Sequence, residues 1–151
     1  ILMYKILTII SFLVITSCTT IQEYENLTQE TDVLLSTSVN GVIFKVQKEK
    51  DLPNVFGRKD VWGGMVDQGE KVLRFMGLNQ NGNLVLRLAD IDIKSNQNVF
   101  TRIGMKRAQL LPENVYEFEF DHKQNKLLDL GYITVSFENV TAYSIRYILN
   151  E

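Results

Sequence analysis

The chain has 151 residues, with 16 Lys+Arg against 18 Asp+Glu and a formal net charge of −2. This balance gives no electrostatic reason to expect nucleic acid as a partner, because nucleic acids select strongly basic surfaces. A single cysteine and a single histidine exclude a disulfide within the chain and do not provide the ligand set of a zinc site.

The first seventeen residues have the pattern of a secretory signal peptide. Lys5 is the only charged side chain among the first 22 residues, and it precedes a run of ten mostly apolar residues, Ile6–Ile15. A basic start, a short apolar run and a small-residue end are the parts of such a signal. The run is well short of the roughly 20 residues that a membrane-spanning helix needs. We therefore expect residues 1–17 to be removed.

The end of this segment, Ile15-Thr16-Ser17-Cys18, resembles the lipobox of bacterial lipoprotein signal peptides. In that pattern an aliphatic residue, a small or Thr-like residue and Gly, Ala or Ser precede the cysteine. The resemblance implies cleavage before Cys18, lipidation of Cys18 and attachment to the bilayer of the cell envelope. Thr19 in place of Asp favours the outer membrane over the inner one by analogy with enterobacterial sorting. An ordinary signal with an incidental cysteine is the alternative.

Removal of residues 1–17 leaves 134 residues, enough for one domain. The removed segment carries one Lys and no acid, which leaves 15 basic against 18 acidic side chains and a net charge of −3. Residues 18–32 are polar, acidic and poor in apolar side chains, so we expect a lipidated Cys followed by a solvated tether. The single globular domain is then expected over residues 33–151.

From Val33 onward, β-branched and aromatic residues alternate with polar ones and turn signals recur at short intervals, which indicates strands. Asn40-Gly41 separates two such runs, and this dipeptide is the strongest short-range hairpin signal. A second hairpin is expected around Asn79–Asn83. In its second strand Leu84, Leu86 and Leu88 share one face, whereas Ile91 and Ile93 fall on the other, so we predict a β-bulge or a bend near Ala89-Asp90.

The remaining pattern predicts an irregular segment over 48–69 and further strands toward the end of the chain. These strands are expected over 99–105, 115–120, 126–130, 132–138 and 141–149. The total is eight or nine strands with no amphipathic helix. The predicted fold is therefore all-β, an antiparallel two-sheet sandwich of immunoglobulin-like type, with a small β-barrel as the alternative.

Residues that could carry catalysis are few. His122 is the only histidine, so every His-dependent mechanism would have to use it, and its polar turn favours a solvated surface residue. The acidic pairs Asp90/Asp92 and Glu117/Glu119 could bind Ca²⁺ or act as a carboxylate pair, but each also fits a solvated or ion-paired strand position. The glycines have no phosphate-binding order, and we expect no cofactor and no metal.

The most suggestive segment is residues 54–64, which contains Phe56, Arg58, Lys59 and the only tryptophan, Trp62. Aromatic residues and Arg on a loop are typical of binding hot spots. The structural alternative is that Phe56 and Trp62 close one end of the sandwich. The sequence thus favours a non-enzymatic envelope lipoprotein that binds a protein or another envelope component. A glycan-directed envelope hydrolase and an inhibitor or immunity-type lipoprotein are the alternatives.

Overall fold

The computed structural model describes residues 20–54, 56–94, 109–110 and 114–151, and all of its regular elements are strands. Ten strands are formed within these residues. Their bounds are β1 Glu23–Leu27, β2 Leu34–Ser38, β3 Val42–Asp51, β4 Met65–Leu78, β5 Leu84–Lys94, β6 Gln109–Leu110, β7 Asn114–Phe120, β8 Leu127–Asp129, β9 Thr134–Val140 and β10 Ser144–Asn150.

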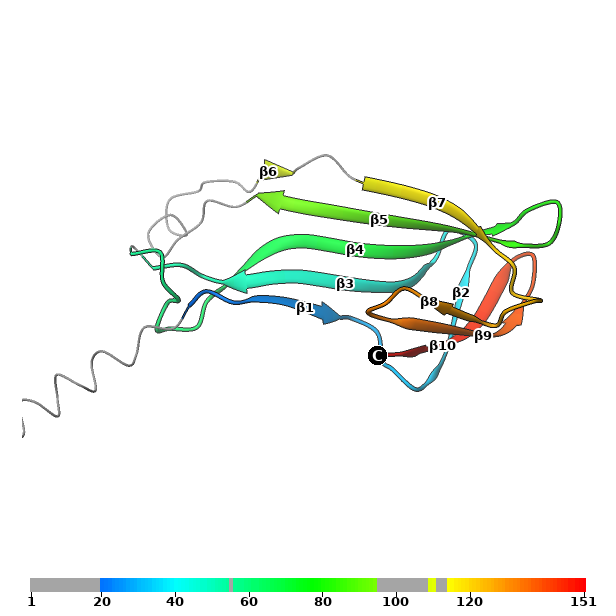
Figure 1. Cartoon of the computed structure of the whole chain (residues 1–151), viewed down its shortest axis with the longest axis horizontal. Coiled ribbons are helices and arrows are strands. Elements are labelled where there is room, and N and C mark those ends of the chain that lie inside the picture. The colour runs from blue at the N-terminus through cyan, green and yellow to red at the C-terminus, as the bar shows by residue number, and fades with distance from the viewer. Residues whose placement is uncertain (1–19, 55, 95–108, 111–113) are drawn as a thin grey trace, which may run out of the picture.

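The strands form two antiparallel sheets (Figure 1). The larger sheet has the order β1-β3-β4-β5, and β5 then pairs with β7 along most of its length and with β6 at its end. The smaller sheet has the order β2-β10-β9-β8. The predicted two-sheet antiparallel sandwich is therefore confirmed, and the alternative of a closed barrel is not what the chain forms.

The core lies between the two sheets. Leu73, Phe75 and Leu86 of the larger sheet are fully buried, as are Val135 and Leu149 of the smaller one. Burial of one such side chain contributes roughly 1.5–3 kcal/mol. The strands predicted over 132–138 and 141–149 thus contribute buried side chains to the core.

A polar contact also joins the two sheets. The Tyr147 hydroxyl donates a hydrogen bond of 2.7 Å to the Ile43 carbonyl oxygen. Burial raises the pKa of Tyr147 to about 12, because the ionised phenolate would lose its hydration.

The Asn40-Gly41 dipeptide does form a turn, and Asn40 adopts a positive φ of 65°. The predicted hairpin is nevertheless wrong, because β2 pairs with β10 whereas β3 pairs with β1 and β4. The Asn40 N–H donates instead to the Phe75 carbonyl oxygen at 2.6 Å. The turn therefore passes the chain from the smaller sheet to the larger one.

Strand β5 keeps one register against β7 from Leu84 to Asp90, so the β-bulge predicted near Ala89-Asp90 is absent. The irregularity in this hairpin lies in β4 instead, between Phe75 and Gly77. The change of apolar face along β5 has a different cause. Its first half packs on the smaller sheet, whereas its second half extends beyond that sheet, where the inner face carries Asp90 and Asp92 (Figure 1).

Two further predictions need comment. Residues 23–27, assigned above to a solvated tether, form β1, which pairs with β3 through the partners Glu23–Lys50, Glu25–Lys48 and Leu27–Val46. Opposite charges across the ladder, and the packing of Leu27 on the core, explain why so polar a segment joins a sheet. The strand expected over 99–105 lies outside the described residues.

Candidate functional site

The connection between β3 and β4, residues 52–64, is much shorter than the irregular segment expected from the sequence, and it is tightly hydrogen-bonded. We call it the 52–64 loop. The Leu52 N–H donates to the Gly64 carbonyl oxygen at 2.7 Å, and the Asp60 N–H donates to the Leu52 carbonyl oxygen at 2.9 Å. Pro53 and Lys59 form an antiparallel bridge. The antiparallel bonding between β3 and β4 thus continues into the loop.

Two turns form the tip of the loop. In the first turn, the Asn54 side-chain oxygen accepts hydrogen bonds from the Phe56 and Arg58 N–H groups at 2.9 and 3.1 Å. In the second turn, Gly63 has a φ of +73° and donates to the Asp60 carbonyl oxygen at 3.2 Å. Glycine adopts this left-handed conformation without steric cost. Both turns are therefore held in place by local bonds.

Each turn presents large apolar side chains to solvent. Phe56 is 84% exposed, Val61 89% and Trp62 90%. The structural alternative, in which Phe56 and Trp62 close an end of the sandwich, is therefore wrong. Exposed apolar side chains are common singly, but three on one ordered loop are a recognised mark of an interaction surface.

Asp51, at the end of β3, holds the loop and the start of the described chain together. The residue is 1% exposed, and its carboxylate accepts hydrogen bonds from the Gln22 N–H at 3.0 Å and from the Tyr24 hydroxyl at 3.4 Å. It also forms an ion pair of 3.0 Å with Lys59. In return, the Asp51 N–H donates to the Gln22 carbonyl oxygen at 3.0 Å. We call this group the Asp51 junction.

The electrostatics of the Asp51 junction keep the pair charged. Burial alone would raise the pKa of Asp51, but the hydrogen bond from Gln22 and the Lys59 ammonium outweigh burial and lower this pKa below its usual value. The hydrogen bond to Asp51 in turn raises the pKa of Lys59. Lys59 thus has a structural task in addition to its predicted place in a binding surface.

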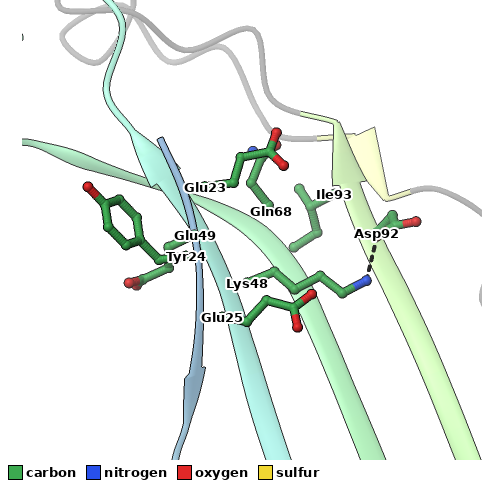
Figure 2. Close-up of a pocket in the computed structure, with 8 residues that line it drawn as sticks. All are labelled: Glu23, Tyr24, Glu25, Lys48, Glu49, Gln68, Asp92 and Ile93. Atoms are coloured by element: carbon green, nitrogen blue, oxygen red, sulfur yellow. Dashed lines mark hydrogen bonds and ion pairs between the residues drawn. The ribbon is translucent and has the colours of Figure 1, made fainter. Parts of the chain in front are cut away.

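A charged cluster occupies the inner face of the larger sheet where the smaller sheet no longer covers it. Lys48 of β3 reaches across β4 and forms an ion pair of 2.7 Å with Asp92 (Figure 2). It forms a second ion pair with Asp90. Beside it, Lys71 forms an ion pair of 2.8 Å with Glu25. Of the two structural alternatives given for Asp90 and Asp92, the ion-paired strand position is the one that forms, with Lys48 as the partner.

The position of Lys48 decides what this face can bind. Burial alone would lower the pKa of Lys48, but the hydrogen bonds to Asp90 and Asp92 outweigh burial and raise it. A cavity of about 320 Å³ lies here, lined by eight residues of β1, β3, β4 and β5, of which four are acidic (Figure 2). Because the Lys48 ammonium already occupies the space between Asp90 and Asp92, these carboxylates do not offer a vacant cation site.

The other acidic pair is on the opposite face of the same sheet. Glu117 forms an ion pair of 2.8 Å with Arg87, and Glu119 accepts a hydrogen bond of 2.6 Å from the Asn79 side-chain amide. Alternation along the strands places these glutamates on the face away from Asp90 and Asp92. The four acids considered for a hydrolase are therefore not brought together across a cleft.

His122 lies in the turn between β7 and β8. It is half-buried rather than fully solvated, and its Nδ1 has no hydrogen-bond partner among the described residues. The turn is at the end of the molecule remote from the 52–64 loop (Figure 1). His122 thus has no association with the predicted binding residues.

Within the described ranges, no group of three or more His, Cys, Asp and Glu side chains is placed to hold a metal ion. The same part of the chain contains no helix long and apolar enough to cross a bilayer. No protein-family model, curated protein or solved structure matches this chain. The class that the fold defines is a two-sheet antiparallel β-sandwich.

Of the predicted site residues, Phe56, Arg58, Lys59 and Trp62 lie together in one loop, and Cys18 lies outside the described residues. Sequence reasoning missed Asp51 and Val61. Asp51 ends the charged run Lys48-Glu49-Lys50-Asp51. Such a run predicts solvated side chains, and no periodicity in it indicates that Asp51 is buried. The exposure of Val61 follows from its position in a turn, which the pattern of the segment did not locate.

Proposed function

We propose that this protein is a lipid-anchored, non-enzymatic binding module of the bacterial cell envelope, attached through Cys18. In this proposal the 52–64 loop is its contact surface for another envelope component. The observation that carries the contact surface is the exposure of Phe56, Val61 and Trp62 on a loop fixed by hydrogen bonds and by the Asp51 junction. Ordered aromatic side chains on a rigid scaffold lose little entropy when they bind.

The anchor is supported by the lipobox-like sequence and by the short apolar run that precedes it. The non-enzymatic character is supported by the ion pairs that the carboxylates considered for catalysis form. Asp90 and Asp92 are paired with Lys48, and Glu117 is paired with Arg87 on the opposite face. No observation favours a glycan hydrolase built on these residues.

Anchoring is tested by Cys18→Ala in the full chain, with metabolic palmitate labelling and membrane fractionation. We expect loss of the label and release from the membrane fraction. A variant that stays membrane-bound and unchanged in size and labelling would refute lipidation at Cys18.

The contact surface is tested separately by a photo-reactive amino acid at position 62 in cells. Position 143 is a matched control, because Tyr143 is 81% exposed in the turn between β9 and β10 at the opposite end of the molecule (Figure 1). We expect an adduct to lipid or protein from position 62 and none from position 143. Equal labelling from both positions would remove the 52–64 loop as the contact surface. A protein adduct would point to the inhibitor or immunity-type alternative.

A further inference from the structure

We infer that the component contacted by the 52–64 loop is the bilayer itself, with Phe56, Val61 and Trp62 inserted at the boundary between headgroups and acyl chains. This inference rests on the proposed anchoring through Cys18. It makes the loop a second, non-covalent attachment point and gives the anchored domain a fixed orientation.

The first argument is the distance that the chain allows. Two hydrogen bonds of 3.0 Å join Gln22 to Asp51, one from the Gln22 N–H to the Asp51 carboxylate and one from the Asp51 N–H to the Gln22 carbonyl oxygen. Asp51 directly precedes the loop. Cys18 is four residues before Gln22, and an extended chain spans at most about 3.6 Å per residue. Residue 18 therefore lies within about 14 Å of Gln22. Figure 1 places the start of β1 and the connection between β3 and β4 at the same end of the molecule.

The second argument is chemical. A lipidated cysteine lies at the membrane surface, so a loop that begins beside Gln22 is held close to the headgroup region. Tryptophan is enriched at membrane interfaces because it combines a large apolar body with one polar N–H group. Phe56 and Val61 add apolar area on the same loop, and none of these three side chains is used by the core. The composition of the loop tip fits an interface between water and hydrocarbon.

The third argument concerns rigidity. The Asp51 carboxylate is bonded both to Gln22, on the side of the anchor, and to Lys59, inside the loop. Gln22 and Lys59 are therefore fixed with respect to each other. A loop ordered before insertion does not lose further backbone entropy at the membrane.

A protein partner fits this position less well. Such a partner would have to approach a loop that is held beside the bilayer by the chain leading to Cys18, and the bilayer would block one side of the approach. At the far end, Tyr143 is equally open to solvent and free of this restriction. The bilayer is the surface that the geometry brings to the loop without any further component.

The test uses Trp62, the only tryptophan of the chain. The full lipidated chain is reconstituted into phosphatidylcholine vesicles, with and without bromine atoms on the acyl chains, and tryptophan fluorescence is recorded. We expect a blue-shifted emission, at least twofold quenching by brominated lipid and a severalfold loss of quenching by aqueous iodide. The matched control, Trp62→Phe with Tyr143→Trp, moves the tryptophan to the far end and should show a water-exposed emission without bromine quenching.

Two further results complete the test. Phe56→Asp together with Val61→Asp places charges on exposed positions that the fold does not use, so the variant should keep its circular dichroism but lose the bromine quenching of Trp62. If the chain floats with the vesicles and carries palmitate, yet Trp62 is quenched no more than a tryptophan at position 143, the bilayer contact is refuted and the anchor stands. If the chain does not float and carries no palmitate, the anchor fails and the bilayer contact fails with it.

Discussion

Removal of the Lys48 ammonium should destabilise the domain, because two carboxylates would then face each other without a cation between them. The Lys48 side chain is 14% exposed, and its partners Asp90 and Asp92 are 32% and 51% exposed. Fully exposed ion pairs contribute about 0.2–1 kcal/mol, whereas hydrogen bonds to charged groups contribute about 1.5–3 kcal/mol. For two half-buried contacts we expect Lys48→Met to lower the free energy of unfolding by about 2 kcal/mol.

The assay is urea denaturation followed by far-ultraviolet circular dichroism, since the single tryptophan is exposed and is a weak reporter of folding. Thermal melts should show a decrease in Tm of about 7 °C for a domain of this size. The matched control is Lys45→Met on the same strand, because the Lys45 side chain is 37% exposed and forms one ion pair, with Glu70, among the described residues. That variant should lose less than about 1 kcal/mol.

A second set of variants separates repulsion from lost packing. Adding Asp90→Asn and Asp92→Asn to Lys48→Met removes both carboxylate charges and should restore about half of the lost stability. If Lys48→Met were no less stable than Lys45→Met, the charged cluster would contribute nothing beyond a surface pair and the reasoning would be wrong.

Three other predictions concern the junction, the core and the hairpin. Because the pKa of Asp51 is lowered in the folded state, the stability that this carboxylate contributes should be fully present above its unfolded-state pKa of about 3.9 and lost as the pH falls through its folded-state pKa. Because the pKa of Lys59 is raised, the stability that this ammonium contributes should be fully present below its unfolded-state pKa of about 10.4 and lost as the pH rises through its folded-state pKa. Asp51→Asn should therefore flatten both limbs of a plot of unfolding free energy against pH, and unchanged limbs would contradict the junction. Tyr147→Phe should cost about 1 kcal/mol in urea denaturation. Ultraviolet titration of the unmodified protein should show a tyrosine ionising near pH 12 that is missing from this variant. Gly69→Ala should cost about 3 kcal/mol or more by the same denaturation assay, because φ is +112° there and the new Cβ would overlap the Ile91 carbonyl oxygen; a loss below about 1 kcal/mol would mean that β4 and β5 separate easily at this point.

Strands with a regular alternation could be located from the sequence. The runs that became β9 and β10 place Val135, Ile145 and Leu149 on faces that are buried in the structure, because a period of two separates the faces of a strand unambiguously. The Asn79–Asn83 turn was also placed correctly, since it separates two strongly patterned runs that pair with each other.

Predictions failed where long-range pairing decided the outcome. Asn40-Gly41 specifies a turn, but the strands on either side of it find other partners. β2 pairs with β10, which is distant in the sequence, and β3 pairs with β1 and β4. Likewise, β1 owes its place to the lysines of β3 across the ladder, and nothing within residues 23–27 indicates those partners. Local patterns therefore gave the turns and the faces, while the neighbours of each strand were determined by tertiary contacts.

The candidate surface was located by composition and corrected in detail by the structure. Phe56, Arg58, Lys59 and Trp62 were chosen because aromatic and cationic residues are concentrated in an irregular segment. Their exposure could not be derived from the sequence, because the same residues would also suit a buried end of the sandwich. The link from the loop to Gln22 depends on the burial of Asp51, for which a charged run gives no signal.

The pairing of β2 with β10 also constrains how the domain is made. Ser38 is the partner of Ser144, and Leu34 that of Ile148, so the smaller sheet joins segments from opposite ends of the domain. Contacts so distant in the sequence slow folding, because the loop between them must close first. A chain that leaves the cytoplasm from its N-terminus would thus have β2 outside long before its partner arrived. The edges of β2 would stay open until β10 emerged, and during this interval the chain would be most exposed to aggregation and to proteases.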